Sequence, residues 1–174
     1  NPAAALTFND KGRGFILGSF RVVMPNDEQN MKKIQQDFGS EAALINNLVR
    51  PTLYKVVTSC GPLMSSLESV SETRTDLISY ITDQLNNGVY KTTVHEIETT
   101  DPLTGEIKKT KVAALIPDEN AAGGYRRSEK SPFAYYGLEI SQVAVSRIAY
   151  SQKVNDQIAQ QQEANMLVQT SKAK

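Results

Sequence analysis

Residues 136–164 read YGLEISQVAVSRIAYSQKVNDQIAQQQEA, and this stretch decides the fold. Its first half predicts an extended strand over residues 135–150. The apolar positions are even-numbered up to Ile140 and become odd-numbered at Val143. Because side chains alternate between the two faces of a strand, this phase switch predicts a β-bulge or sharp bend near Gln142.

The second half predicts a helix that begins at Ser151 or Gln152 and continues without a breaker to Lys174. Val154 and Ile158 lie one turn apart on a common face. Glutamines and asparagines fill so many of the other positions that the helix is too polar to be buried as an isolated core helix. Such a helix packs beside neighbours or stands in solvent.

Upstream of this stretch, the pattern predicts two strands followed by helices, and the first strand is a short one over residues 6–8. Residues 15–24 alternate between apolar and polar, which predicts a half-buried strand. Helical spacing then predicts one helix over residues 26–38 and a second over residues 40–60, kinked or split at Pro51. A third helical stretch occupies residues 63–85.

Two further strands, residues 92–99 and 106–116, flank a turn-rich connector and predict a hairpin with a long loop. Its arms carry opposite charges, which can face one another at about 0.2–1 kcal/mol per contact. The charged residues are Glu96 and Glu98 on the first arm and Lys108, Lys109 and Lys111 on the second. An exposed loop around Arg126-Arg127 is predicted for residues 117–132.

The composition of the 174 residues is that of a folded protein, with 40% hydrophobic and 22% charged residues. Nineteen basic residues balance nineteen acidic ones, so the net charge does not favour nucleic acid or an anionic bilayer as a partner. The longest apolar runs are far shorter than the ~20 residues that cross a bilayer. The chain begins at Asn1 and a helical pattern continues to Lys174, which predicts a segment of a longer protein.

No constellation in the sequence predicts catalysis, a metal or a cofactor. His95 is the single histidine, which excludes a multi-histidine metal site. The glycines around Arg13 miss the dinucleotide-binding spacing and precede a strand rather than a helix. Cys60 is the lone cysteine and cannot form an internal disulfide. Acidic residues interleave with the basic pairs, so nucleic-acid binding is not favoured either, and the prediction is a protein without enzymatic activity.

Residues 136–150, followed by the helix over residues 154–164, resemble the end of the band-7 or SPFH domain of stomatins, prohibitins, flotillins and bacterial membrane-protease regulators. In that family a glycine and a β-branched run lead into a long helix rich in alanine, glutamate and glutamine. Residues 19–25 resemble the family's strand before its first helix. Arg74, followed by the apolar residues 77, 78 and 81, resembles the family's third helix with its characteristic arginine.

The resemblance implies an α+β fold in which a small antiparallel sheet packs with helices. Residues 1–150 would form the band-7 domain, and residues 151–174 the start of a long assembly helix. The chain departs from the family in a hairpin and loop inserted at about residues 91–134, where the family has a short connection. The membrane-inserting N-terminal segment that is typical of the family is expected outside these residues, so membrane attachment is implied by the resemblance alone.

The resemblance further implies a membrane-associated homo-oligomeric scaffold that organises a membrane or regulates membrane proteins. The partners would be other copies of the chain, and a membrane reached through a segment outside the chain. The helix positions expected to form an intersubunit seam are Val154, Ile158, Gln161, Asn165 and Val168. The alternative is an adaptor or regulatory subunit of a membrane protease or another complex, docked through residues 91–134. Deleting the hairpin distinguishes the two, because self-assembly survives if the hairpin binds a partner and fails if it joins subunits.

Overall fold

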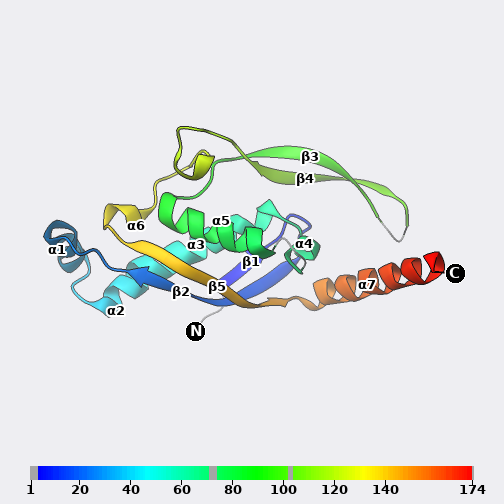
Figure 1. Cartoon of the computed structure of the whole chain (residues 1–174), viewed down its shortest axis with the longest axis horizontal. Coiled ribbons are helices and arrows are strands. Elements are labelled where there is room, and N and C mark those ends of the chain that lie inside the picture. The colour runs from blue at the N-terminus through cyan, green and yellow to red at the C-terminus, as the bar shows by residue number, and fades with distance from the viewer. Residues whose placement is uncertain (1–3, 71–73, 102–103, 174) are drawn as a thin grey trace.

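The computed structural model describes residues 4–70, 74–101 and 104–173. Its main sheet has three antiparallel strands in the order β1-β2-β5 (Figure 1). These strands are β1 (Ala4–Thr7), β2 (Arg13–Val23) and β5 (Glu139–Tyr150). The predicted last strand therefore starts a few residues later than expected, because the short helix α6 (Pro132–Tyr135) precedes it.

The bulge predicted near Gln142 is confirmed. The β2–β5 pairing steps from Ser19↔Ala144 to Arg21↔Ser141, and Gln142 has a left-handed φ of 52°. Such an extra residue moves the following side chains to the other face of the strand. Ile140 is buried and Val143 is half-buried, so both phases of the apolar pattern face the core.

Helices cover one face of this sheet, and the longest of them are α3 (Arg50–Cys60) and α5 (Arg74–Asn87) (Figure 1). The others before the hairpin are α1 (Glu28–Asp37), α2 (Glu41–Leu44), a π-helical turn (Ile45–Val49), a 3-10 turn (Gly61–Leu63) and α4 (Ser66–Val70). The core between helices and sheet holds Leu77, Leu85 and Phe133, each with 0% of its surface exposed. Arg74 lies in α5, which agrees with its predicted place in a helix with residues 77, 78 and 81.

The helix over residues 41–60 is neither split nor sharply broken at Pro51. The π-helical turn Ile45–Val49 lies directly before the proline instead. Pro51 has no N–H to donate and its ring crowds the preceding turn. A wider helical turn at that point accommodates both constraints.

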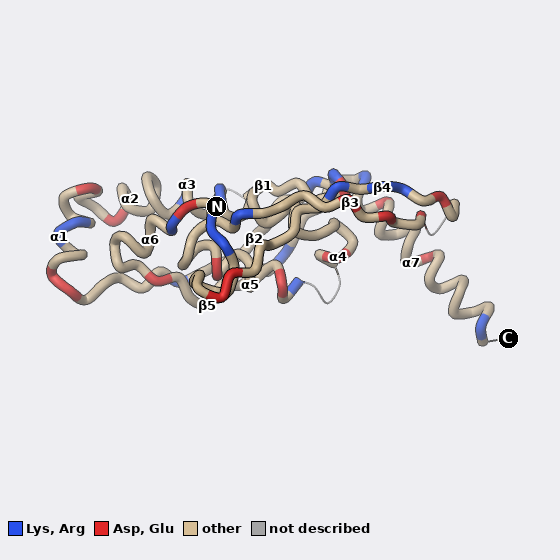
Figure 2. The backbone as a smooth tube through the Cα atoms, turned by 90° about the horizontal axis from the view of Figure 1, so that it is seen from above, with Lys and Arg blue, Asp and Glu red and all other residues tan. Residues whose placement is uncertain are grey.

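Two elements project from the same end of the molecule (Figures 1 and 2). One is the hairpin of β3 (Thr92–Thr100) and β4 (Ile107–Leu115), and the other is α7 (Gln152–Lys172), the last helix. The hairpin and the long helix agree with the sequence predictions, and α7 begins after Ser151 as expected. The hairpin and α7 therefore carry surfaces that do not pack against the core of their own chain.

Candidate assembly surface

The start of α7 is fixed to the domain. Its N-cap Ser151 donates its backbone N–H to the carbonyl of Arg13 at 3.0 Å. One turn later Val154 has only 1% of its surface exposed. It packs against Gly12, where an added Cβ would come within 2.8 Å of Val154 Cγ2. The direction in which α7 leaves the domain is therefore set by its first turn.

Beyond that turn, α7 has little contact with its own chain. Among the described residues of α7, Val154 is the only buried one. Exposed apolar residues gather near the far end, with exposed fractions of 68% for Met166, 66% for Leu167 and 51% for Val168. A helix of this kind is stabilised mainly by packing against neighbours.

The predicted seam residues are distributed along this helix. Val154 is covered within the chain itself, whereas Ile158 and Gln161 are half-buried and Asn165 and Val168 are exposed. Exposure therefore rises along the stripe as α7 leaves the domain. The seam itself stays a prediction. Its exposed residues, Asn165 and Val168, lie in the outer half of α7.

The hairpin is exposed over all of β3 and the outer part of β4, whereas residues 112–115 of β4 are half-buried. Every residue of β3 is exposed, including Val94 at 69%, and so is Ile107 of β4 at 67%. Register pairs Glu96 with Lys111 and Glu98 with Lys109, which confirms that the charged arms face one another. An ion pair of 3.6 Å also joins Lys109 Nζ to Glu96 Oε1.

The prediction was wrong for Lys108. Its register partner is Thr99, which places it on the face opposite to that of Glu96 and Glu98. Its ammonium group lies 3.8 Å from Asp101 in the loop instead. The physical reason is the strict alternation of side chains along a strand, which separates consecutive lysines between two faces.

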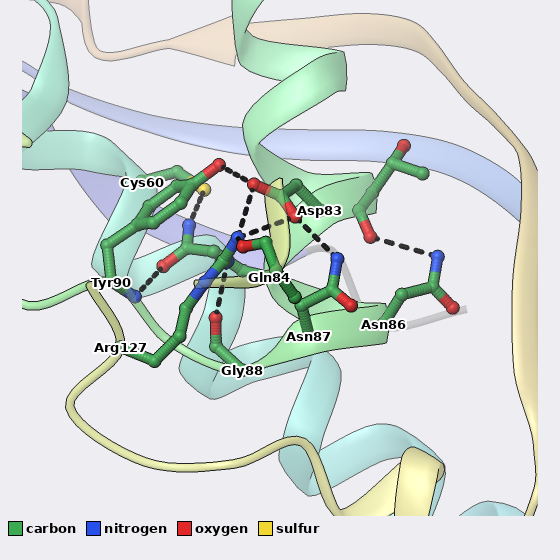
Figure 3. A network of polar contacts seen from close by, with 10 residues as sticks. Cys60, Asp83, Gln84, Asn86, Asn87, Gly88, Tyr90 and Arg127 are labelled. Atoms are coloured by element: carbon green, nitrogen blue, oxygen red, sulfur yellow. Dashed lines mark hydrogen bonds and ion pairs between the residues drawn. The ribbon is translucent and has the colours of Figure 1, made fainter. Parts of the chain in front are cut away.

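A polar cluster clamps the base of the hairpin to α5 (Figure 3). Arg127 Nη2 donates to both oxygens of Asp83 at 2.8 Å, and its Nη1 donates to the carbonyl of Gly88 at 2.9 Å. The guanidinium also lies 4.5 Å above the ring centre of Tyr90, whose hydroxyl donates to Asp83. A cation at the C-terminal end of a helix is favourable, because the unpaired carbonyls there carry partial negative charge.

The prediction of an exposed loop around Arg126-Arg127 was wrong for Arg127. Arg126 is exposed, but the side chain of Arg127 keeps only 10% of its surface. The loop is also tied down by bridges from Tyr90 to Arg127 and from Pro117 to Tyr125. The sequence pattern missed the ion pair because its two members lie far apart along the chain, and adjacent arginines alone do not show which one is buried.

Burial and hydrogen bonding shift the pKa of Asp83 in opposite directions. Burial opposes its charge, but hydrogen bonds from Tyr90, Asn87 and Arg127 outweigh this effect and hold the pKa of Asp83 below its ordinary value. The carboxylate is therefore charged when it binds Arg127. Burial, together with the hydrogen bond to Asp83, raises the pKa of Tyr90.

A second set of contacts runs from the hairpin base into the core. Gln84 is buried, accepts the backbone N–H of Tyr90 at 3.0 Å and donates its Nε2 to Cys60 Sγ at 3.0 Å (Figure 3). Burial raises the pKa of Cys60 to about 12. Its thiol is therefore protonated and inert at neutral pH. The clamp and this glutamine together hold the hairpin in a fixed direction.

The model of the SPFH domain / Band 7 family matches residues 17–174. The chain belongs to this family. Comparisons with curated proteins and with solved structures each gave no match.

SPFH proteins are generally membrane-associated scaffolds or regulators that do not act as enzymes. Within the described residues of this SPFH domain, no helix is long and apolar enough to cross a membrane. In the same described ranges, no cluster of three or more His, Cys, Asp or Glu residues has the arrangement of a metal site. His95 lies exposed on β3, with its Nε2 3.0 Å from the hydroxyl of Thr93.

Proposed function

We propose that this SPFH domain is the subunit of a membrane-associated homo-oligomeric scaffold, in which α7 forms the contact between copies. The observation that carries the proposal is the exposure of α7, which is anchored by Val154, half-buried at Ile158 and Gln161, and exposed beyond residue 164. Such a helix gains stability when it packs beside a copy of itself. Scaffolding in this sense means holding many copies in a regular array at a membrane surface.

The predicted seam follows the spacing of a coiled coil. Positions 154, 158, 161, 165 and 168 alternate steps of four and three residues, which keeps them on one side of a helix. The seam contains glutamine and asparagine as well as valine and isoleucine, so each pair of helices contributes little. Weak contacts of this kind favour assembly from many repeated copies rather than tight dimers.

Replacing Val168 by lysine tests the seam. We expect Val168→Lys to raise the concentration at which half of the chain is assembled by about tenfold, since like charges would meet across the seam. Sedimentation velocity over a range of concentrations measures this midpoint. Met166→Lys is the matched control, because two residues along a helix differ by about 200° and place Met166 on the opposite side. Its midpoint should stay within about threefold of the wild-type value. Equal effects of both substitutions would show that α7 does not associate through this seam.

An adaptor that binds another protein through the hairpin is the second candidate function. The observation that favours it is the exposure of β3 along its full length, with charged and apolar residues side by side. Exposed strand edges are common sites of peptide binding by strand addition. The two candidate functions differ in the partner of the hairpin. In the adaptor another protein binds it, and in the scaffold a second copy of the chain does.

A further inference from the structure

The β3–β4 hairpin has two outer edges that pair with no further strand in the described part of the chain, although residues 112–115 of β4 are half-buried. Among the described residues, β3 and β4 pair with each other and form a sheet of two strands. Each outer edge therefore presents backbone N–H and C=O groups that can pair with another strand. A hairpin of only two strands is marginally stable by itself in water, so a third and fourth strand would stabilise it.

The two edges carry opposite charges on one face. Glu96 and Glu98 lie on β3, and Lys109 and Lys111 lie opposite them on β4. All four side chains are on the same face of the hairpin, because they are separated by two residues along each strand. One edge of the hairpin is thus acidic and the other is basic.

These charges select one way of joining two hairpins. Two β3 edges would place glutamates against glutamates, and two β4 edges would place lysines against lysines, both of which are unfavourable. A β4 edge against the β3 edge of a second copy places each glutamate between two lysines. Such a contact uses two different surfaces and is head-to-tail, so repetition generates a ring or a filament.

The direction of the two projections fits this arrangement. The hairpin and α7 leave the domain at the same end (Figures 1 and 2). Copies that stand side by side through α7 therefore hold their hairpins side by side, pointing the same way. In that orientation β4 of one copy is antiparallel to β3 of the next, which is the arrangement of a continuous antiparallel sheet.

We propose that the hairpins of neighbouring copies pair edge to edge, with β4 of one copy against β3 of the next, as a second contact of the assembly. This proposal rests on the homo-oligomeric function above. Pairing also places exposed apolar side chains beside those of the next copy and partly covers them, among them Val94 and Ile97 of β3 and Ile107 of β4. The ion pair of Arg127 with Asp83 holds each hairpin in position for this pairing.

Cross-linking between two single-cysteine variants tests the proposal. One population carries Lys109→Cys and the other Glu98→Cys, each with a different affinity tag, and the two are expressed together and treated with a short bismaleimide. The native Cys60 is fully buried, so the introduced thiols are the reactive ones. Neighbouring strands lie about 4.8 Å apart, so we expect at least about fivefold more cross-linked heterodimer than homodimer of either variant.

Thr99→Cys is the matched control for Glu98→Cys. Thr99 is the next residue of β3 and lies on the opposite face, opposite Lys108. It should give little heterodimer with Lys109→Cys. Heterodimer at the level of this control, or a majority of homodimers, overturns the proposal, and this is also the outcome if the hairpin binds a different protein.

Sedimentation of the wild-type chain separates this proposal from the function on which it rests. A wild-type chain that stays monomeric overturns both. A wild-type chain that assembles, combined with absent heterodimers, overturns only the pairing of hairpins and leaves α7 as the contact between copies.

Discussion

Replacing Arg127 by alanine lowers the free energy of unfolding by about 3 kcal/mol, because it leaves Asp83 charged and poorly paired at the end of α5. Asp83 accepts hydrogen bonds from Arg127 and Asn87, and its own side chain is only 21% exposed. The same change frees the carbonyl groups of Gly88 and Ala122. Denaturation by urea, monitored by circular dichroism, measures the loss.

Arg126→Ala is the matched control for this substitution. Arg126 is the neighbouring residue and forms an exposed ion pair with Asp118 at 3.6 Å. Exposed pairs of this kind contribute about 0–1 kcal/mol, so the control should unfold at nearly the wild-type urea concentration. Equal losses for Arg126→Ala and Arg127→Ala would contradict the role of the clamp.

The effect of Arg127→Ala also depends on pH. The folded-state pKa of Asp83 is lowered, so the stability from its charged form is fully present above its unfolded pKa of about 3.9. It is lost as the pH falls through the lowered folded-state pKa. The difference between wild type and Arg127→Ala should therefore be large at pH 7 and shrink below about pH 4.

Replacing Gly18 by alanine should lower the free energy of unfolding by about 3 kcal/mol, because the added methyl group has no room between β2 and β5. A Cβ at Gly18 would lie 2.2 Å from the backbone oxygen of Ala144. The strands approach so closely because the register shifts between Leu17 and Gly18. The backbone oxygen cannot move away without breaking the pairing of the two strands.

Gly14→Ala provides the comparison. Gly14 lies in the same strand, and a Cβ there would meet its nearest atom, Ile148 Cγ2, at 3.4 Å. Glycine within a strand costs roughly 0.5–1 kcal/mol relative to alanine, so Gly14→Ala should leave the free energy of unfolding unchanged or raise it by up to about that amount. The two variants are compared by the same urea titration. A Gly18→Ala variant as stable as Gly14→Ala would mean that β2 and β5 are not packed as described.

The main sheet could be predicted in large part from the period of its apolar residues. The switch from Ile140 to Val143 predicted one bulge, and the structure has it at Gln142. A second register shift, near Ser146, was not predicted. The same signal was present, because the buried position after Val145 is Ile148, three residues later.

The clamp at the base of the hairpin could not be predicted from the sequence. Asp83 and Arg127 meet only when the loop folds back onto the end of α5. Periodicity describes neighbours along one element and carries no information about such a contact. The same limit applies to Val154, because a helical stripe shows which residues share a face but not whether the domain or a second copy covers them.

The hairpin could be predicted in part. Its strands and its opposite charges followed from composition and turn residues, and strict alternation would also have separated Lys108 from Lys109. Its exact pairing could not be derived, because a long loop does not set the register as a two-residue turn does.

The proposed scaffold requires that this SPFH domain assembles with copies of itself. Sedimentation velocity of the wild-type chain tests it most directly, over a series of concentrations with and without lipid vesicles. If the chain assembles, species heavier than the 19.2 kDa monomer appear, and their share grows with concentration and on vesicles. A single 19.2 kDa species under every condition would contradict it.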